Sequence, residues 1–136
     1  MSSQIGLIIE QIAVEIVANS DVDAAYDGHK SKNPSEPYAE VYMDEFGDNQ
    51  QEIQGTFDMP ARVAVFVVGA QVESTREMTE TLAKYFTNGP SETLQGSTMN
   101  VINIQVRSWE IEPQRDDTKG AFTSSIEFNI LIRYTI

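Results

Sequence analysis

The sequence predicts an α+β fold in which two helices pack against a mostly antiparallel sheet, with a long protruding β-hairpin at the C-terminus. Three observations support this prediction. The chain opens with an amphipathic helical stretch, a strand without a polar face lies in its middle, and residues 122–136 alternate without a break between an apolar and a mostly polar side. The length of 136 residues fits one domain, so we predict a single domain over residues 1–136.

The first helix is predicted over residues 5–17, because isoleucines recur there at helical spacing. These are Ile5, Ile8, Ile9, Ile12 and Ile16. Val14 and Val17 lie off this stripe, which indicates that a second face of the helix is covered as well. Residues 20–37 lose the period and collect Asp, Gly, Asn and Pro, so we expect a long loop there.

Strands follow the loop. Residues 38–45 alternate in polarity, and residues 51–57 fit a short partner strand. We expect Asp58-Met59-Pro60 to end this strand. The next strand follows and is apolar on both faces from Val63 to Val68. Such a strand needs cover on both sides.

A second helix is predicted over residues 72–87, ending at Asn88-Gly89-Pro90. Its apolar stripe consists of Val72, Thr75, Thr79, Leu82 and Phe86. We expect the two helices to sandwich the sheet, with Ile12 and Leu82 in the core.

Two long strands joined by a charged tip form the predicted hairpin. In the first strand Ile102, Ile104 and Val106 share one face, whereas Trp109 and Ile111 have the opposite parity, so we expect a β-bulge near Arg107-Ser108. The charged tip, residues 112–121, is either solvated or reaches a neighbouring subunit. In the second case its charges would pair across the seam, the contact between two adjacent subunits. The candidate subunit-interface residues are Glu112, Arg115, Asp116, Asp117 and Lys119.

The chain is strongly acidic, with 9 Lys and Arg against 21 Asp and Glu and a net charge of −12. This balance argues against direct binding of duplex DNA, which needs clustered basic side chains to neutralise phosphates. The acidity either keeps a small protein soluble or repels a polyanion that passes close by.

The sequence offers no candidate for a metal, cofactor or catalytic site. The single histidine, His29, lies in the polar loop, and the absence of cysteine removes thiolate ligands and nucleophiles. Asp21, Asp23 and Asp27-Gly28 do not fit a calcium loop, because the glycine comes two places late. We therefore expect a protein without cofactor or enzymatic activity. The longest apolar stretch, residues 61–70, is too short for a membrane helix, so we expect no membrane partner and no leader peptide.

The order of these segments resembles the tail-terminator (tail-completion) family of long-tailed bacteriophages. The resemblance is carried by the opening helix and by YAEVYMDE, ARVAVFVVGA, STREMTETLAKYF, NVINIQVRSWEIEP and AFTSSIEFNILIRYTI. The acidic loop from Asp21 to Pro37 departs from the family in detail.

The resemblance implies a homo-oligomeric ring, typically a hexamer, that caps the phage tail tube and joins it to the head connector or neck protein. It implies a place at the head-proximal end of the tail in the virion, after assembly in the host cytoplasm, with DNA passing through the bore without specific binding. Candidates for acidic residues facing that channel are Asp44, Glu45 and Asp48. The alternatives are another phage neck or connector adaptor protein, a small acidic enzyme, or a binding module.

Overall fold

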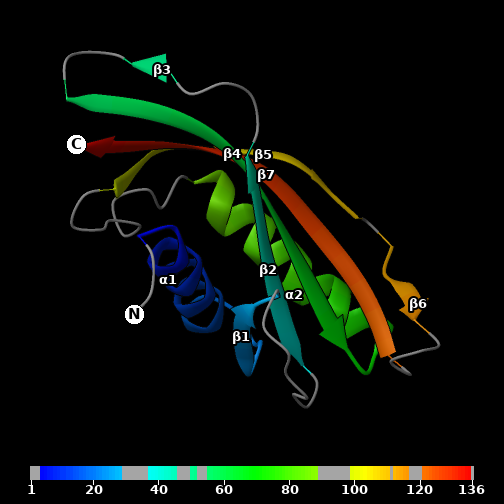
Figure 1. Ribbon diagram of the computed structural model, residues 1–136. Helices are drawn as coiled ribbons and strands as arrows, with labels where there is room; N and C mark the ends of the chain where they lie inside the picture. The colour runs from blue at the N-terminus through cyan, green and yellow to red at the C-terminus, as the bar shows by residue number, and fades with distance from the viewer. Residues whose placement is uncertain are drawn as a thin grey trace.

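The computed structural model describes residues 4–28, 37–45, 50–51, 55–88, 99–110, 112–116 and 121–135 (Figure 1). Its elements are α1 (Gln4–Ala18), β1 (Ala24–Asp27), β2 (Tyr38–Glu45), β3 (Gln50–Gln51), β4 (Thr56–Gly69), α2 (Val72–Thr87), β5 (Met99–Trp109), β6 (Gln114–Asp116) and β7 (Ala121–Thr135). The strands form one sheet in the order β1-β2-β4-β7-β5, with β3 beside β4 and β6 beside β7. Of these pairs only β1 with β2 is parallel. The predicted α+β fold with a mostly antiparallel sheet is confirmed.

Both helices pack on the same side of the sheet, so the predicted sandwich is wrong (Figure 1). The Tyr85 hydroxyl of α2 donates a hydrogen bond to the Glu15 carboxylate of α1 at 2.6 Å, and both helices contribute to one continuous core. We call the side of the sheet away from the helices the open face. There β4 is shielded by aromatic side chains instead of a helix, since the Tyr42 ring packs edge-on against Phe66 at 5.6 Å. This shielding explains why β4 can be apolar on both faces.

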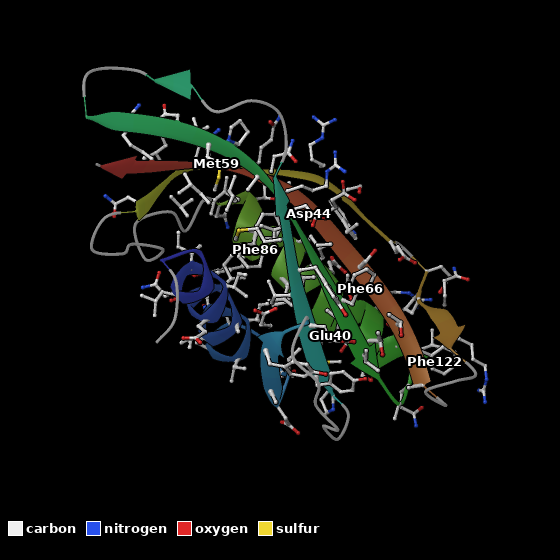
Figure 2. All side chains as sticks on the ribbon, viewed as in Figure 1. Glu40, Asp44, Met59, Phe66, Phe86 and Phe122 are labelled. Atoms are coloured by element: carbon white, nitrogen blue, oxygen red, sulfur yellow. The ribbon has the colours of Figure 1, made fainter. Side chains whose placement is uncertain are left out.

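The core lies between the two helices and the sheet. Its fully buried side chains include Ile8, Ile12 and Ile16 from α1 and Leu82 and Phe86 from α2. The predicted isoleucine stripe and the core positions Ile12 and Leu82 are thereby confirmed, while the side chain of Ile5 lies outside the described residues. Phe86, labelled in Figure 2, lies between α2 and the sheet. Its ring stacks on Phe128 of β7 at 4.6 Å between centroids.

Two segments differ from their predicted conformations. Residues 24–27 form β1 inside the expected loop, because Tyr26 stacks on Tyr38 at 6.1 Å and the backbone pairs in parallel with β2. Residues 58–60 continue β4 instead of breaking it, because Asp58 is held by Arg133 and Pro60 lies opposite Leu131 of β7. Local turn signals are overridden in both segments by contacts with distant parts of the chain.

The register between β5 and β7 shifts between Val106 and Ser108, which confirms the bulge predicted near Arg107. A second shift, between Val101 and Asn103, was not predicted. It places Val101 in the core and leaves Ile102 exposed, so the predicted face shared by Ile102 and Ile104 is wrong at Ile102.

The C-terminal hairpin is embedded in the sheet along its second strand. β7 pairs with β4 from Phe122 to Thr135 and carries β5 and then β6 on its other side. Because β5 and β6 share that side of β7, β6 continues the sheet edge formed by β5.

Gly69, at the end of β4, is held close to the first turn of α2. A Cβ at this position would overlap the Thr75 hydroxyl oxygen, which donates a hydrogen bond to the Gln71 carbonyl at 2.6 Å. We expect Gly69→Ala to lower the free energy of unfolding by about 1–3 kcal/mol, measured by urea titration. In a Thr75→Ala background the same substitution should cost less, because the overlapping oxygen is gone. An equal cost in both backgrounds would contradict this account.

Candidate assembly surfaces

The described residues contain no cluster of three or more His, Cys, Asp or Glu side chains that could hold a metal ion. Neither helix of the described part is long and apolar enough to cross a membrane. His29 lies outside the described residues. The absence of metal, cofactor and enzymatic activity stays a prediction. The features that could serve function are the exposed surfaces described below.

The open face carries the first of the predicted channel residues. Alternation along β2 puts Glu40, Tyr42 and Asp44 on this face, since the intervening Ala39 and Val41 are buried in the core (Figure 2). The Asp44 side chain is exposed, and the Tyr42 hydroxyl donates a hydrogen bond to Glu40 at 3.1 Å. The other two candidates are not placed: Asp48 and the side chain of Glu45 lie outside the described residues.

Two ion pairs of contrasting burial link β4 and β7 across the open face. Arg133 donates two hydrogen bonds to the Asp58 carboxylate, at 2.8 and 2.9 Å, and Asp58 is only 4% exposed. Arg62 and Glu127 approach to 3.4 Å with both side chains about half exposed. The first pair is a bidentate contact in a nearly buried place, whereas the second is an ordinary surface pair.

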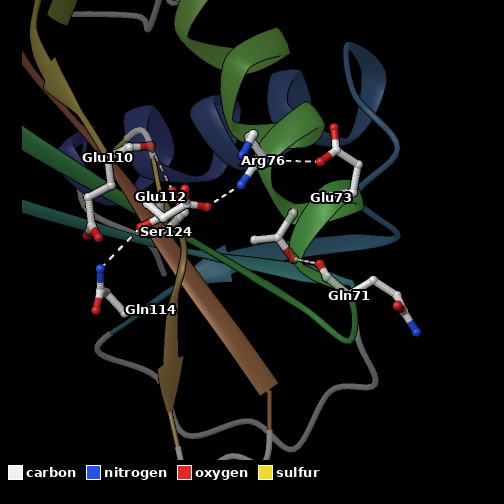
Figure 3. A network of polar contacts seen from close by, with 8 residues as sticks. Gln71, Glu73, Arg76, Glu110, Glu112, Gln114 and Ser124 are labelled. Atoms are coloured by element: carbon white, nitrogen blue, oxygen red, sulfur yellow. Dashed lines mark hydrogen bonds and ion pairs between the residues drawn. The ribbon is translucent and has the colours of Figure 1, made fainter.

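The predicted interface residue Glu112 takes part in a polar network within the chain (Figure 3). Arg76 of α2 forms ion pairs with both Glu112 and Glu73, and the Gln114 side-chain amide donates to the Glu112 carbonyl at 3.2 Å. The hydrogen bond that Arg76 donates to the Glu112 carboxylate, together with the charges of Glu112 and Glu73, raises the pKa of Arg76 above its ordinary value. The network fixes the start of the charged tip against α2.

The other predicted interface residues are partly described. Arg115 is exposed on β6, with its guanidinium 5.9 Å from the centre of the Phe122 ring. Asp117, Lys119 and the side chain of Asp116 lie outside the described residues. The structure therefore brings Glu112 and Arg115 to one sheet edge, and their role in a subunit contact stays a prediction.

An apolar groove runs between α1 and the edge strand β1. We call it the α1–β1 groove; its volume is about 570 Å³, and it is lined by Glu10, Ala13, Val14, Val17, Ala18, Ala25, Tyr26 and Asp27. Val14 is 65% exposed and Val17 40%. Both are the valines that lie off the isoleucine stripe, so the sequence did signal a second apolar face, but no described residue of the chain covers it.

The opposite edge of the sheet, which we call the β5 edge, also exposes apolar side chains. Trp109, at the end of β5, is 47% exposed and lies beside the last turn of α2 next to Lys84 and Thr87. Ile102 is exposed by the first bulge, and Arg107 by the second. The sequence pattern places Ile102 and Trp109 on strand faces but does not predict their exposure, because single-strand periodicity does not reveal which strand ends a sheet.

No family model matches the sequence, and no curated protein matches it either. Among solved structures, the fold is shared with a chain from the virion of a native gene transfer agent particle. The TM-score is 0.62, the superposition covers 96% of this chain and 93% of that chain, and 11% of the residues are identical. At this identity the similarity is one of fold.

Proposed function

We propose that the chain is a structural protein of a phage-like virion, which forms a ring that caps the tail tube and joins it to the head connector or neck protein. The observation that carries the proposal is the fold shared over nearly the whole of both chains with a component of a gene transfer agent virion. The role is structural and not enzymatic. The resemblance of the sequence to tail terminators supports the more specific place at the head-proximal end of the tail.

The charge of the chain suits a ring around a DNA channel. Each copy carries a net charge of −12, and a closed ring multiplies that charge around the bore. The open face, with Asp44 exposed and Glu40 nearby on β2, is the side that we assign to the channel, with Glu45 and Asp48 following in the chain. Repulsion between these carboxylates and phosphates would let DNA pass without being held.

The charged tip is the part that we assign to contact with a neighbouring copy. Glu112 and Arg115 lie on the sheet edge, and Asp116, Asp117 and Lys119 continue the tip in sequence. Exposed ion pairs usually contribute about 1 kcal/mol or less each, but a ring repeats the same contact at every seam. The tip would therefore set the geometry of the seam more than its strength.

Capping can be tested by polymerising the cognate tube protein with and without this chain. We expect tubes of limited length with a ring at one end, because a cap blocks further addition. Electron microscopy measures tube length and end structure, and Thr81→Glu, an exposed change on α2 that adds one negative charge, is the control variant. Unrestricted tubes without a decorated end would refute the proposed function. A ring that binds only the connector would instead favour a neck adaptor.

A further inference from the structure

The exposed large apolar side chains of the described residues gather at two separate places. Leu7, Val14 and Val17 project from α1, and Ile102 and Trp109 project from β5. The two places lie at opposite edges of the sheet, since β1 and β5 are the two ends of the strand order. Four steps of about 4.8 Å between neighbouring strands separate those edges. One chain therefore cannot cover either surface with the other.

We propose that the α1–β1 groove of one copy receives the β5 edge of the next copy, with Trp109 as the anchor. This inference rests on the proposed ring and deepens it by assigning its seam. Tryptophan is enriched among the residues that carry most of the energy of a protein interface, where it fills a desolvated pocket of the partner. The groove, at about 570 Å³, has room for an indole ring and its neighbours.

Charge supports the same pairing. Every charged residue in residues 4–28 is acidic, and two of them, Glu10 and Asp27, line the groove. The β5 edge presents Arg107 in its second bulge and Lys84 beside Trp109, where Lys84 also forms a 3.0 Å ion pair with Glu80. The acidic rim of the groove and Arg107, the one charged residue of β5, favour this orientation over groove to groove or edge to edge.

The pairing is heterologous, because one surface meets a different surface of the neighbour. Repeating such a contact generates a ring when the rotation closes, which a symmetric two-fold contact cannot do. β6 pairs on the same side of β7 as β5 with Trp109, so Glu112 and Arg115 would extend the seam from its apolar centre. The seam would then have an apolar centre and a polar rim, as stable interfaces do.

The test uses two single variants of the full chain, separately and mixed. Val14→Glu puts a charge into the groove, and Trp109→Ala removes the anchor; both positions are exposed, so both variants should fold. We expect each variant alone to be monomeric by native mass spectrometry and light scattering. In an equimolar mixture, the intact groove of Trp109→Ala can bind the intact β5 edge of Val14→Glu. The mixture should give a heterodimer and no larger species, because the two surfaces left free in that dimer are the altered ones. The Thr81→Glu variant should form rings like the wild-type chain.

Several outcomes would overturn the seam. Dimers of Trp109→Ala alone would indicate a groove-to-groove contact, and dimers of Val14→Glu alone an edge-to-edge contact. Rings formed by either variant, or a wild-type chain that stays monomeric up to its solubility limit, would also exclude it. A Val14→Glu variant that forms rings but fails to bind the tube would assign the groove to the tube protein. Wild-type rings that assemble through this seam but do not cap tubes would refute the proposed function and leave the seam intact.

Discussion

Phe128→Ala is expected to lower the free energy of unfolding by about 3–5 kcal/mol, a large share of the roughly 5–15 kcal/mol that stabilises a typical domain. Phe128 is fully buried in β7, an interior strand of the sheet, where its ring stacks on Phe86 of α2. Truncation would leave a cavity at the point where the sheet and α2 meet. Urea titration monitored by circular dichroism measures the loss.

The measurement is best made in the Val14→Glu background, so that ring dissociation does not add to unfolding. Leu131→Ala is the matched control, because Leu131 lies on the same strand but is only half-buried on the open face. Its cost should be clearly smaller. A loss below about 1 kcal/mol for Phe128→Ala would mean that the Phe86–Phe128 stack is not at the centre of the core.

Arg133→Ala should have the next largest effect, about 1.5–3 kcal/mol, because it removes two charge-assisted hydrogen bonds from a nearly buried carboxylate. Arg62→Ala is the matched control on the same face of the sheet. Its ion pair with Glu127 is about half exposed, so its removal should cost about 0–1 kcal/mol. Thermal and urea unfolding of the two variants would give the comparison.

A double-mutant cycle with Asp58→Ala isolates the contact between the two side chains. If the Asp58–Arg133 pair is the cause, Arg133→Ala should cost much less once Asp58 is absent. Equal costs for Arg133→Ala and Arg62→Ala, or no coupling in the cycle, would show that the bidentate contact does not stabilise the strand pair.

The sequence predicted the elements whose signals are local. The isoleucine stripe of α1 and the bulge at Arg107 follow from spacing and parity, and both are confirmed. The position of the helices was predicted wrongly, because an apolar strand face shows that cover is needed but not whether a helix or a ring such as Tyr42 supplies it. β1 and the continuation of β4 through Pro60 are not predicted either, because both strands depend on pairing with distant parts of the chain. β1 pairs with β2, and Pro60 lies opposite β7.

The candidate surfaces were predictable only in part. Glu112 and Arg115 stood out because a charged run between two strands marks a tip, and the structure brings both to one edge. The ion pair between Glu112 and Arg76 joins residues far apart in the chain, which no spacing rule reveals. The α1–β1 groove has a local sign in Val14 and Val17, but its second wall comes from β1, whose residues the sequence predicts as loop.

The pairing of β4 with β7 also has a consequence for the order of folding. The paired residues that lie nearest in sequence, Gly69 and Phe122, are still separated by α2, β5 and β6. The middle of the sheet therefore closes through non-local contacts, which form slowly compared with helices and short hairpins. Until β7 docks, β4 presents an unpaired apolar edge that can pair with another chain. Refolding yield should consequently fall as protein concentration rises, with aggregates rich in β-structure as the competing product.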